Sequence, residues 1–252
     1  MSEIQYGPLT LLGEDEYTVT ACRRDAVRVE LPGTVDGIPV LRIGECAFAD
    51  CDKLREVIFA EGGDITDDPW IDFRIEANAF MNCSALKEIE LPYYVQSIGH
   101  GAFYGCTGLK RADFPTYCSM SDYVFAGCKS LREVPLLTSV TEGMFSGCAS
   151  LTALPLSDKA STVETDAFEH CHGLTAVVIP ATVTRIGSEA FSNCRNLKSV
   201  RFANPVGWYC KSFRSLDGGP RDYLELSDPI ANARRLVSMD FDEGVIAWCR
   251  DK

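Results

Sequence analysis

Hydrophobic residues recur along most of the chain with one fixed internal spacing. A Phe is followed by a Cys at the third position and by a Leu three residues after that Cys. A further apolar residue comes three positions after the Leu in every copy but one, where Ala112 stands. The pattern occurs in seven copies, whose Phe and Cys anchors are Phe48, Cys51, Phe80, Cys83, Phe103, Cys106, Phe125, Cys128, Phe145, Cys148, Phe168, Cys171, Phe191 and Cys194.

This spacing predicts one strand and one return segment in each copy. The L-x-x-Φ-x-Φ segment, as in residues 86–91, suits a short strand in a parallel sheet with neighbours about 4.8 Å apart. The V-x-x-I-G-x-x-A-F stretch, clearest over residues 183–191, supplies the return. Glycine readily takes a positive φ, so we expect tight bends of that kind at Gly44, Gly99 and Gly187.

The length of the repeat predicts the fold class. Successive Cys anchors are separated by 32, 23, 22, 20, 23 and 23 residues. One such unit is too short to bury its own apolar face, whereas stacked units bury a continuous core. This period and leucine spacing indicate a leucine-rich-repeat solenoid. We expect short parallel β-strands on one face, irregular, short-strand or 3-10 returns on the other, and a right-handed coil.

One copy carries a specific resemblance. The segment L-T-A-V-V-I-P-A-T-V-T-R-I-G-S-E-A-F-S-N-C over residues 174–194 resembles the BspA-like leucine-rich repeats of bacterial surface proteins and some protists. Residues 17–22, 27–32 and 37–44 are similar to the N-terminal unit of that family, and the resemblance extends over residues 17–203. It implies a binding scaffold, with surface adhesion or host interaction in many relatives.

The repeat boundaries suggest three segments. Residues 1–45 are expected to form an N-terminal cap and first rung, and residues 46–203 the seven repeats. Residues 204–252, where the repeat stops, are expected to cap the last exposed core layer, as solenoids require. Within this C-terminal segment, a short helix is expected over residues 230–238.

Two irregularities distinguish this solenoid. The first repeat is lengthened by an acidic insertion over residues 60–77, whose aspartates are Asp64, Asp67, Asp68 and Asp72. We expect a solvated loop there, with Ca²⁺ chelation by these carboxylates as the alternative. The central units are short, and Pro135 and Pro155 stand where a strand residue is expected. Because proline cannot donate to a ladder, we expect the sheet to be interrupted or bulged there.

The composition of the chain limits the classes of partner and the compartments that we expect. The chain has 252 residues, 46% hydrophobic, and a formal net charge of −12, which makes nucleic acid and anionic membrane surfaces poor partners. No apolar run is long enough to insert in a membrane. No secretory signal is visible, and the 12 Cys favour a reducing compartment such as the cytoplasm, whereas the resemblance favours a cell-surface or secreted location. A monomer with an unidentified protein partner is expected.

No group of residues in the sequence predicts a catalytic or metal-binding site. The Cys anchors should stack as a linear column that does not converge on a tetrahedral zinc site, so we expect them to pack as small hydrophobic residues. His170 and His172 flank Cys171 in a pattern that resembles a metal motif, but Cys171 should point inward and the two His outward. We find no nucleophile motif or phosphate loop. We therefore predict no catalytic residues, no metal and no cofactor.

The outward positions of the strands form the candidate partner-binding face. Since alternate strand residues face opposite sides, this face should be acidic in the early repeats and small and apolar in the later ones. The hypothesis is that the protein is a non-catalytic scaffold that binds a protein or ligand on this face. The alternative for the face is an ordinary solvated sheet, partly covered by the C-terminal segment. The alternatives for the function are an intracellular structural scaffold, an unrecognised enzyme and a carbohydrate binder. The candidate residues are Glu56, Glu88, Glu90, Arg111, Asp113, Glu133, Ala153, Pro155, Ala176, Val178 and Arg201.

Overall fold

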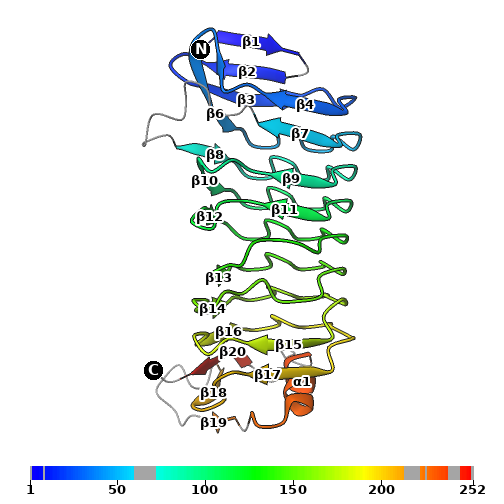
Figure 1. Ribbon diagram of the computed structural model, residues 1–252, viewed down its shortest axis with the longest axis vertical. Coiled ribbons are helices and arrows are strands. Elements are labelled where there is room, and N and C mark those ends of the chain that lie inside the picture. Colours follow the sequence, from blue (N-terminus) through cyan, green and yellow to red (C-terminus); the bar gives the residue numbers. More distant parts are fainter. Residues whose placement is uncertain are drawn as a thin grey trace. The chain divides into compact units, whose positions relative to one another are not determined.

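The computed structural model describes residues 2–7, 9–59, 72–212, 222–224, 226–237 and 245–250. The chain divides into two compact units, residues 1–135 (unit 1) and residues 136–252 (unit 2), each of which is a stack of solenoid turns. In each turn, the L-x-x-Φ-x-Φ segment lies on what we call the first face, and the return segment lies on the second face (Figure 1).

The first face of unit 1 carries one short strand per turn. β4 pairs in parallel with β7, and β9 pairs in parallel with β11, all in register residue by residue. Outward and inward residues alternate along them, as the sequence predicts: Ile89 is buried between the exposed Glu88 and Glu90. These strands are β4 (Arg28–Leu31), β7 (Glu56–Phe59), β9 (Glu88–Glu90) and β11 (Arg111–Asp113).

The second face of unit 1 is a continuous sheet. Its order is β1-β2-β3-β6-β8-β10-β12, with parallel pairing from β3 onward, an antiparallel start at β1 and β2, and the two-residue β5 hairpinned to β6. The strands are β1 (Ser2–Tyr6), β2 (Leu9–Gly13), β3 (Tyr17–Cys22), β5 (Thr34–Val35), β6 (Ile38–Ile43), β8 (Phe73–Ile75), β10 (Val95–Ile98) and β12 (Ser119–Met120).

Unit 2 continues the same two-faced turn. On its first face, β15 (Ala176–Ile179) pairs in parallel with β17 (Ser199–Phe202). Its second face has the order β13-β14-β16-β20-β18-β19, parallel up to β16 and antiparallel beyond it. These strands are β13 (Ser139–Val140), β14 (Thr162–Val163), β16 (Arg185–Gly187), β18 (Trp208–Ser212), β19 (Asp222–Tyr223) and β20 (Val245–Arg250).

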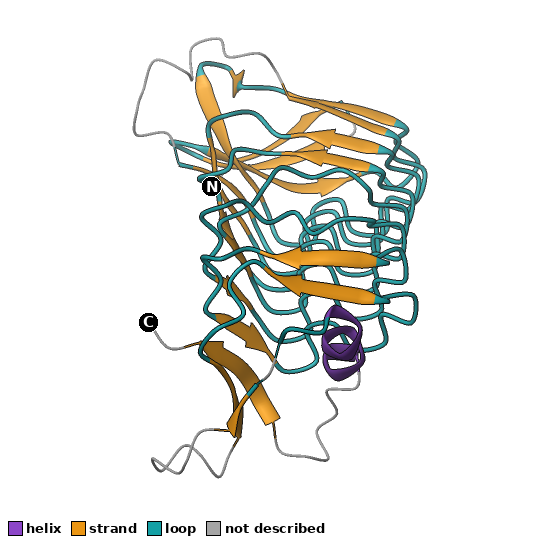
Figure 2. Cartoon of the chain, turned by 60° about the horizontal axis from the view of Figure 1, so that its bottom comes forward, coloured by secondary structure: helices purple, strands orange, loops and turns teal. Residues whose placement is uncertain are grey.

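The described residues after the last repeat cover the end of unit 2. Helix α1 (Pro229–Val237), close to the expected 230–238, packs beside β17 (Figure 2). The amide of its fully buried Asn232 donates to the carbonyl of Val200 in β17 at 3.1 Å. Trp208 packs edge-on against Phe202 at 5.0 Å between ring centroids. A hydrogen-bond donor and an aromatic layer therefore meet the last repeat.

The core of each turn is built at the A-F-x-x-C corner. The Phe rings stack on one another in successive turns, with centroids 4.7 Å apart for Phe48 and Phe80 and 5.2 Å for Phe80 and Phe103 in unit 1. In unit 2, Phe168 stacks between Phe145 and Phe191. All seven anchor Phe and all seven anchor Cys are buried, as the repeat predicts. The solenoid fold expected from the sequence is confirmed.

The glycine prediction is wrong in its cause. Gly44, Gly99 and Gly187 do not have positive φ. A Cβ on Gly99 would lie 2.6 Å from the backbone nitrogen of Ala77, and one on Gly187 would lie 2.3 Å from that of Thr165. These glycines are therefore required by the close approach of the preceding turn rather than by a left-handed backbone.

Positive φ occurs at two other positions of every repeat, two residues before and two residues after the Phe. Examples are Asn78, with φ of 55°, and Asn82, with φ of 60°, on either side of Phe80. Asn, Asp and Gly, which tolerate this conformation, hold most of these positions. The full set is Cys46, Asp50, Asn78, Asn82, Gly101, Gly105, Tyr123, Gly127, Gly143, Gly147, Asp166, His170, Glu189 and Asn193.

The prolines interrupt the first face as expected. Glu133 makes only an isolated bridge to Arg111, and no strand forms over residues 131–136 or 151–155. Because proline lacks the amide proton of a ladder, the parallel pairing in these turns is reduced to isolated bridges, of which the second joins Leu137 and Leu156.

Candidate functional site

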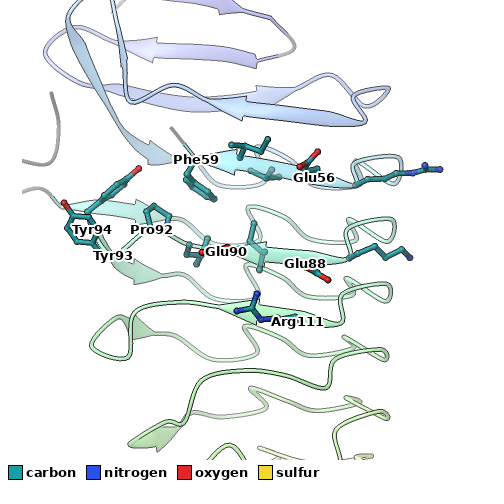
Figure 3. Close-up of a pocket in the computed structure, with 14 residues that line it drawn as sticks. Glu56, Phe59, Glu88, Glu90, Pro92, Tyr93, Tyr94 and Arg111 are labelled. Carbon is teal, nitrogen blue, oxygen red and sulfur yellow. The ribbon is translucent and has the colours of Figure 1, made fainter. Parts of the chain in front are cut away.

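A groove opens on the first face of unit 1, between β7 and β9. It has a volume of about 880 Å³, and four of the candidate face residues, Glu56, Glu88, Glu90 and Arg111, line it (Figure 3). The rest of its wall comes from the same two strands and the corner after β9. These residues are Arg55, Val57, Ile58, Phe59, Lys87, Ile89, Leu91, Pro92, Tyr93 and Tyr94.

The groove exists because two consecutive turns separate on this face. β7 belongs to the sheet with β4, and β9 to the sheet with β11, so β7 and β9 are not hydrogen-bonded to each other as strands. The same turns stay joined elsewhere, since β8 pairs with both β6 and β10 on the second face. Only the first face opens, which leaves a slit that is closed at its base.

The charges that line the groove differ in their partners. The Glu56 carboxylate lies 3.5 Å from the guanidinium of Arg28. Arg111 pairs with Asp113 at 2.5 Å and approaches Glu133 at 3.9 Å. All of these pairs are solvent-exposed, so each contributes little to the free energy of folding.

Glu88 and Glu90 are exposed and make no ion pair with any residue that the structure describes. In a chain of net charge −12, these two carboxylates therefore present negative charge that is available to a basic partner.

One end of the groove is aromatic. Tyr93 and Tyr94 follow β9, Tyr93 with 61% of its surface exposed and Tyr94 with 7%. Burial raises the pKa of Tyr94, and the neighbouring Tyr93 adds to the shift. The hydroxyl of Tyr117, from the next turn, donates to the carbonyl of Tyr93. Tyr93 thus offers a largely exposed ring, of the kind enriched at protein interfaces, on a backbone that Tyr117 holds.

Sequence reasoning missed this aromatic end. It followed the alternation along the strands and stopped at the proline after them. The signal was present, because Pro92 is followed by two tyrosines, whereas the corresponding Pro180 is followed by Ala181 and Thr182.

Five of the candidate face residues lie in unit 2. Ala153, Ala176, Val178 and Arg201 are exposed, Val178 with 44% of its surface, so α1 does not cover them. Pro155 is buried, which corrects its predicted outward position. The alternation fails there because no strand forms in that turn, so nothing holds the residue in the strand register.

The cysteine column is a hydrogen-bonded packing element. Five of the seven anchor thiols donate to the carbonyl of the Phe anchor in the preceding turn, at 3.1 Å for Cys106 and Phe80 and at 3.0 Å for Cys194 and Phe168. The thiol of Cys51, at the first corner, donates to the carbonyl of Cys22 instead. Burial raises the pKa of Cys194 to about 12. A thiol whose pKa is raised in this way is protonated at neutral pH, which is the form that donates a hydrogen bond and not the form that binds metal. At Cys51, by contrast, the hydrogen bond with Cys22 lowers the pKa of the thiol.

The His170-Cys171-His172 segment points Cys171 inward and His170 outward as expected, whereas His172 is half-buried, with its ring centroid 5.9 Å from that of His170. Cys171 is buried in the column, while His170 has 46% of its side chain exposed and lies 3.3 Å from the carboxylate of Glu169. Nowhere in the described part of the chain do three His, Cys, Asp or Glu side chains gather in a way that could hold a metal ion.

Most of the acidic insertion lies outside the described residues, including Asp64, Asp67 and Asp68. Asp72, which is described, forms hydrogen bonds with the guanidinium of Arg74, and these lower the pKa of its carboxyl group. The Ca²⁺ alternative at this insertion stays a prediction. Across the described residues, none of the helical structure is long and apolar enough to cross a membrane.

Comparison with known proteins points to one family. The sequence model of the BspA type leucine rich repeat region matches residues 73–198 in six copies. No curated protein matches the sequence.

Several solved structures are similar. A leucine rich cell surface protein from Faecalibacterium prausnitzii is 30% identical with a TM-score of 0.65, over 80% of this chain and 55% of that one. The leucine-rich-repeat protein of T. pallidum is 24% identical with a TM-score of 0.50, over 79% of this chain and 82% of that one. A leucine-rich-repeat protein from Eubacterium ventriosum is 19% identical with a TM-score of 0.57, over 76% and 49%. The last two likenesses show the fold alone, and the chain spans about half the length of the first.

Proposed function

Because the chain belongs to the BspA-type leucine-rich-repeat family, we propose that it is a non-catalytic interaction scaffold which holds a partner protein in the first-face groove of unit 1. The observation that carries the proposal is the meeting of Glu88, Glu90 and Tyr93 in one groove of about 880 Å³. Exposed carboxylates select a partner by charge, and an exposed tyrosine supplies a large contact area at a protein interface.

A catalytic role has less support. The described lining of the groove contains no Ser, Thr, Cys or His side chain, so it lacks the nucleophile and base that hydrolytic triads combine. A repeat scaffold with a charged and aromatic groove fits binding better than chemistry.

We further propose that the protein acts at a cell surface, in adhesion or host contact. The support for this role is the 30% identical relative from Faecalibacterium prausnitzii, which is described as a cell surface protein. The competing candidate is an intracellular structural scaffold, which is favoured by the 11 free cysteines among the described residues. Protease shaving of intact source cells separates the two, because only a surface protein is cleaved while a cytoplasmic marker stays whole.

Photo-crosslinking tests the binding groove. We expect benzoylphenylalanine at Tyr93, inside the groove, to crosslink a protein in the native surroundings, and the same group at Tyr104 to crosslink none. Tyr104 is a matched control because it is also exposed, at 47%, and lies outside the groove. Equal capture from both positions, or capture from Tyr104 alone, would contradict the proposal.

A further inference from the structure

The first corner of unit 1 departs from the repeat at one position. The amide of Cys22, at the end of β3, donates to the carbonyl of Ala47 at 2.8 Å, and the amide of Phe48 donates to the carbonyl of Ala79 in the same way. Cys22 therefore stands where the following turn carries its Phe anchor. A thiol takes the place of an aromatic ring at the N-terminal end of the Phe stack.

The presence of Cys22 at this position brings two thiols together. The sulfur of Cys51, the first of the cysteine column, lies 4.0 Å from the carbonyl oxygen of Cys22. The corresponding Cys83 donates to the carbonyl of Phe48 at 3.1 Å, so the backbone holds the Cys51 thiol less closely. The Cys51 thiol also shares a side-chain hydrogen bond with the thiol of Cys22. Both cysteines are free in this structure.

Cys22 and Cys51 meet from different positions of the corner. Two neighbouring thiols of the column, such as Cys83 and Cys106, occupy the same position in successive turns, so their Cα–Cβ bonds run parallel. A disulfide, with a dihedral angle of roughly 90° about its S–S bond, disfavours parallel bonds of this kind. Cys22 holds the Phe position, three residues before the position of the column thiols, so its Cα–Cβ bond is not required to run parallel to that of Cys51.

The pair also differs from the following thiols of the column in access and acidity. Cys22 is half-buried, whereas Cys83 and Cys106 are fully buried. The hydrogen bond with Cys22 lowers the pKa of the Cys51 thiol, and the nearby guanidinium of Arg24 acts in the same direction against the effect of burial. At Cys83, the hydrogen bond with Cys106 and burial raise the pKa instead. Because the thiolate is the reactive form of cysteine, Cys51 is the nucleophile of the pair.

We propose that Cys22 and Cys51 form a redox-sensitive pair, which hydrogen peroxide converts to a disulfide. The Cys51 thiolate attacks one oxygen of the peroxide, the O–O bond breaks, and Cys51 becomes a sulfenic acid while hydroxide leaves. The sulfur of Cys22 then attacks the sulfur of Cys51 and displaces the hydroxyl group, which leaves as water with the Cys22 proton. Each sulfur loses one electron, and the peroxide is reduced to two molecules of water.

The disulfide joins the N-terminal turn to the first repeat. Cys22 ends β3, and Cys51 lies in the segment that leads to β7, one wall of the groove. The bond closes the loop over residues 22–51, and a crosslink of this kind stabilises a fold mainly by restricting the unfolded chain. The inference goes beyond the proposed function, because it makes the stability of unit 1 depend on the redox state of its surroundings.

Peptide mapping of the full chain tests the pair without any substitution. The reduced protein is treated with hydrogen peroxide, the remaining thiols are alkylated, and the chain is digested without reductant. We expect mass spectrometry to find the peptide of Cys22 linked to that of Cys51 as the first disulfide to form. We expect the midpoint of thermal unfolding to rise by roughly 5 °C or more, and to fall back when the disulfide is reduced.

Two serine variants separate this pair from general thiol oxidation. Cys118 is the matched control, because it is also half-buried and burial raises its pKa to about 11. Cys118→Ser should form the same disulfide as the wild-type chain. Cys22→Ser should not form it, and its Cys51 should stop at the sulfenic acid, which dimedone labels.

The absence of a peptide that links Cys22 to Cys51 in the oxidised wild-type chain would overturn the inference, whatever other disulfides form. Equal dimedone labelling of Cys51 in the wild-type chain and in Cys22→Ser would also overturn it, because Cys22 would then not react with the sulfenic acid. Either result leaves the proposed function standing, since neither cysteine lines the groove.

Discussion

The same pair of turns in unit 1 is joined at the A-F-x-x-C corner and separated on the first face. At the corner, Phe48 and Phe80 stack at 4.7 Å, and the Cys83 thiol donates to the Phe48 carbonyl at 3.1 Å. On the first face, β7 and β9 of these turns do not pair, and charged side chains surround the gap. The two turns carry the repeat motif at both places, but they are joined at the corner and separate on the first face.

This difference shows at which positions packing limits the choice of residue. A corner position must fit between identical neighbours above and below, so changes in its volume act on a closely packed interior. A groove position faces solvent, so its side chain is free to serve a partner. Changes at the corner should therefore affect stability, and changes in the groove should affect binding.

The largest expected effect is at the Phe stack. Phe80→Ala should lower the free energy of unfolding by about 3–5 kcal/mol, because it removes a buried ring that touches rings on both sides. Urea denaturation measures the loss. Tyr104→Ala, at an exposed ring, should change the free energy by less than about 0.5 kcal/mol. Similar losses in the two variants would remove the distinction between corner and surface.

The next effect separates close approach from backbone conformation at glycine. Gly99→Ala should lower the free energy of unfolding by about 1–3 kcal/mol, since its Cβ would meet the backbone of Ala77 at 2.6 Å. Gly37, with φ of 80° and open space around it, should lose about 1–2 kcal/mol as Ala. Asn, which tolerates a positive φ, should recover part of the loss at Gly37 and none at Gly99. Recovery at Gly99 would contradict the close-approach account.

A smaller effect is expected in the cysteine column. Cys106→Ala should lower the free energy of unfolding by about 1–2 kcal/mol, because it removes a buried side chain and its hydrogen bond to the Phe80 carbonyl. Cys46→Ala, at an exposed thiol outside the column, is the control and should stay within about 0.5 kcal/mol. Chemical denaturation of the two variants under reducing conditions measures both free energies of unfolding. Equal values would show that the buried thiol does not stabilise the fold.

The smallest effect on stability is expected in the groove. Glu88→Gln combined with Glu90→Gln should change the free energy of unfolding by less than about 0.5 kcal/mol, because both carboxylates are exposed and have no ion-pair partner among the described residues. The same variant should capture less partner protein through benzoylphenylalanine at Tyr93. A large loss of stability would show that these carboxylates serve the fold rather than a partner.

The sequence predicted the corner much better than the groove. Fixed spacing located every Phe and Cys in the core, since each of these residues contacts its own counterpart in the next turn. The alternation along the strands also placed Glu88 and Glu90 outward, because the residue between them, Ile89, faces the core. It failed at Pro155, because a turn without a strand has no register to follow.

The groove itself could not be predicted, since it depends on which neighbouring turns pair and not on the residues of one turn. Nothing in the L-x-x-Φ-x-Φ pattern distinguishes β7 and β9 from β9 and β11, although the first pair is open and the second closed. The insertion after Phe59 marked the irregular turn in the sequence, but not the face that would open. The contribution of Tyr93 was visible only once the corner after β9 had been placed beside the slit.

Residue-resolved amide hydrogen exchange tests the opening of the first face most directly. The amides of Glu88 and Glu90 face the slit, whereas that of Leu91 is bonded to Asp113. In the free protein, the account predicts fast exchange at Glu88 and Glu90 and slow exchange at Leu91. Equal protection of all three amides in the free protein would mean that β7 and β9 pair in solution, and it would contradict the account.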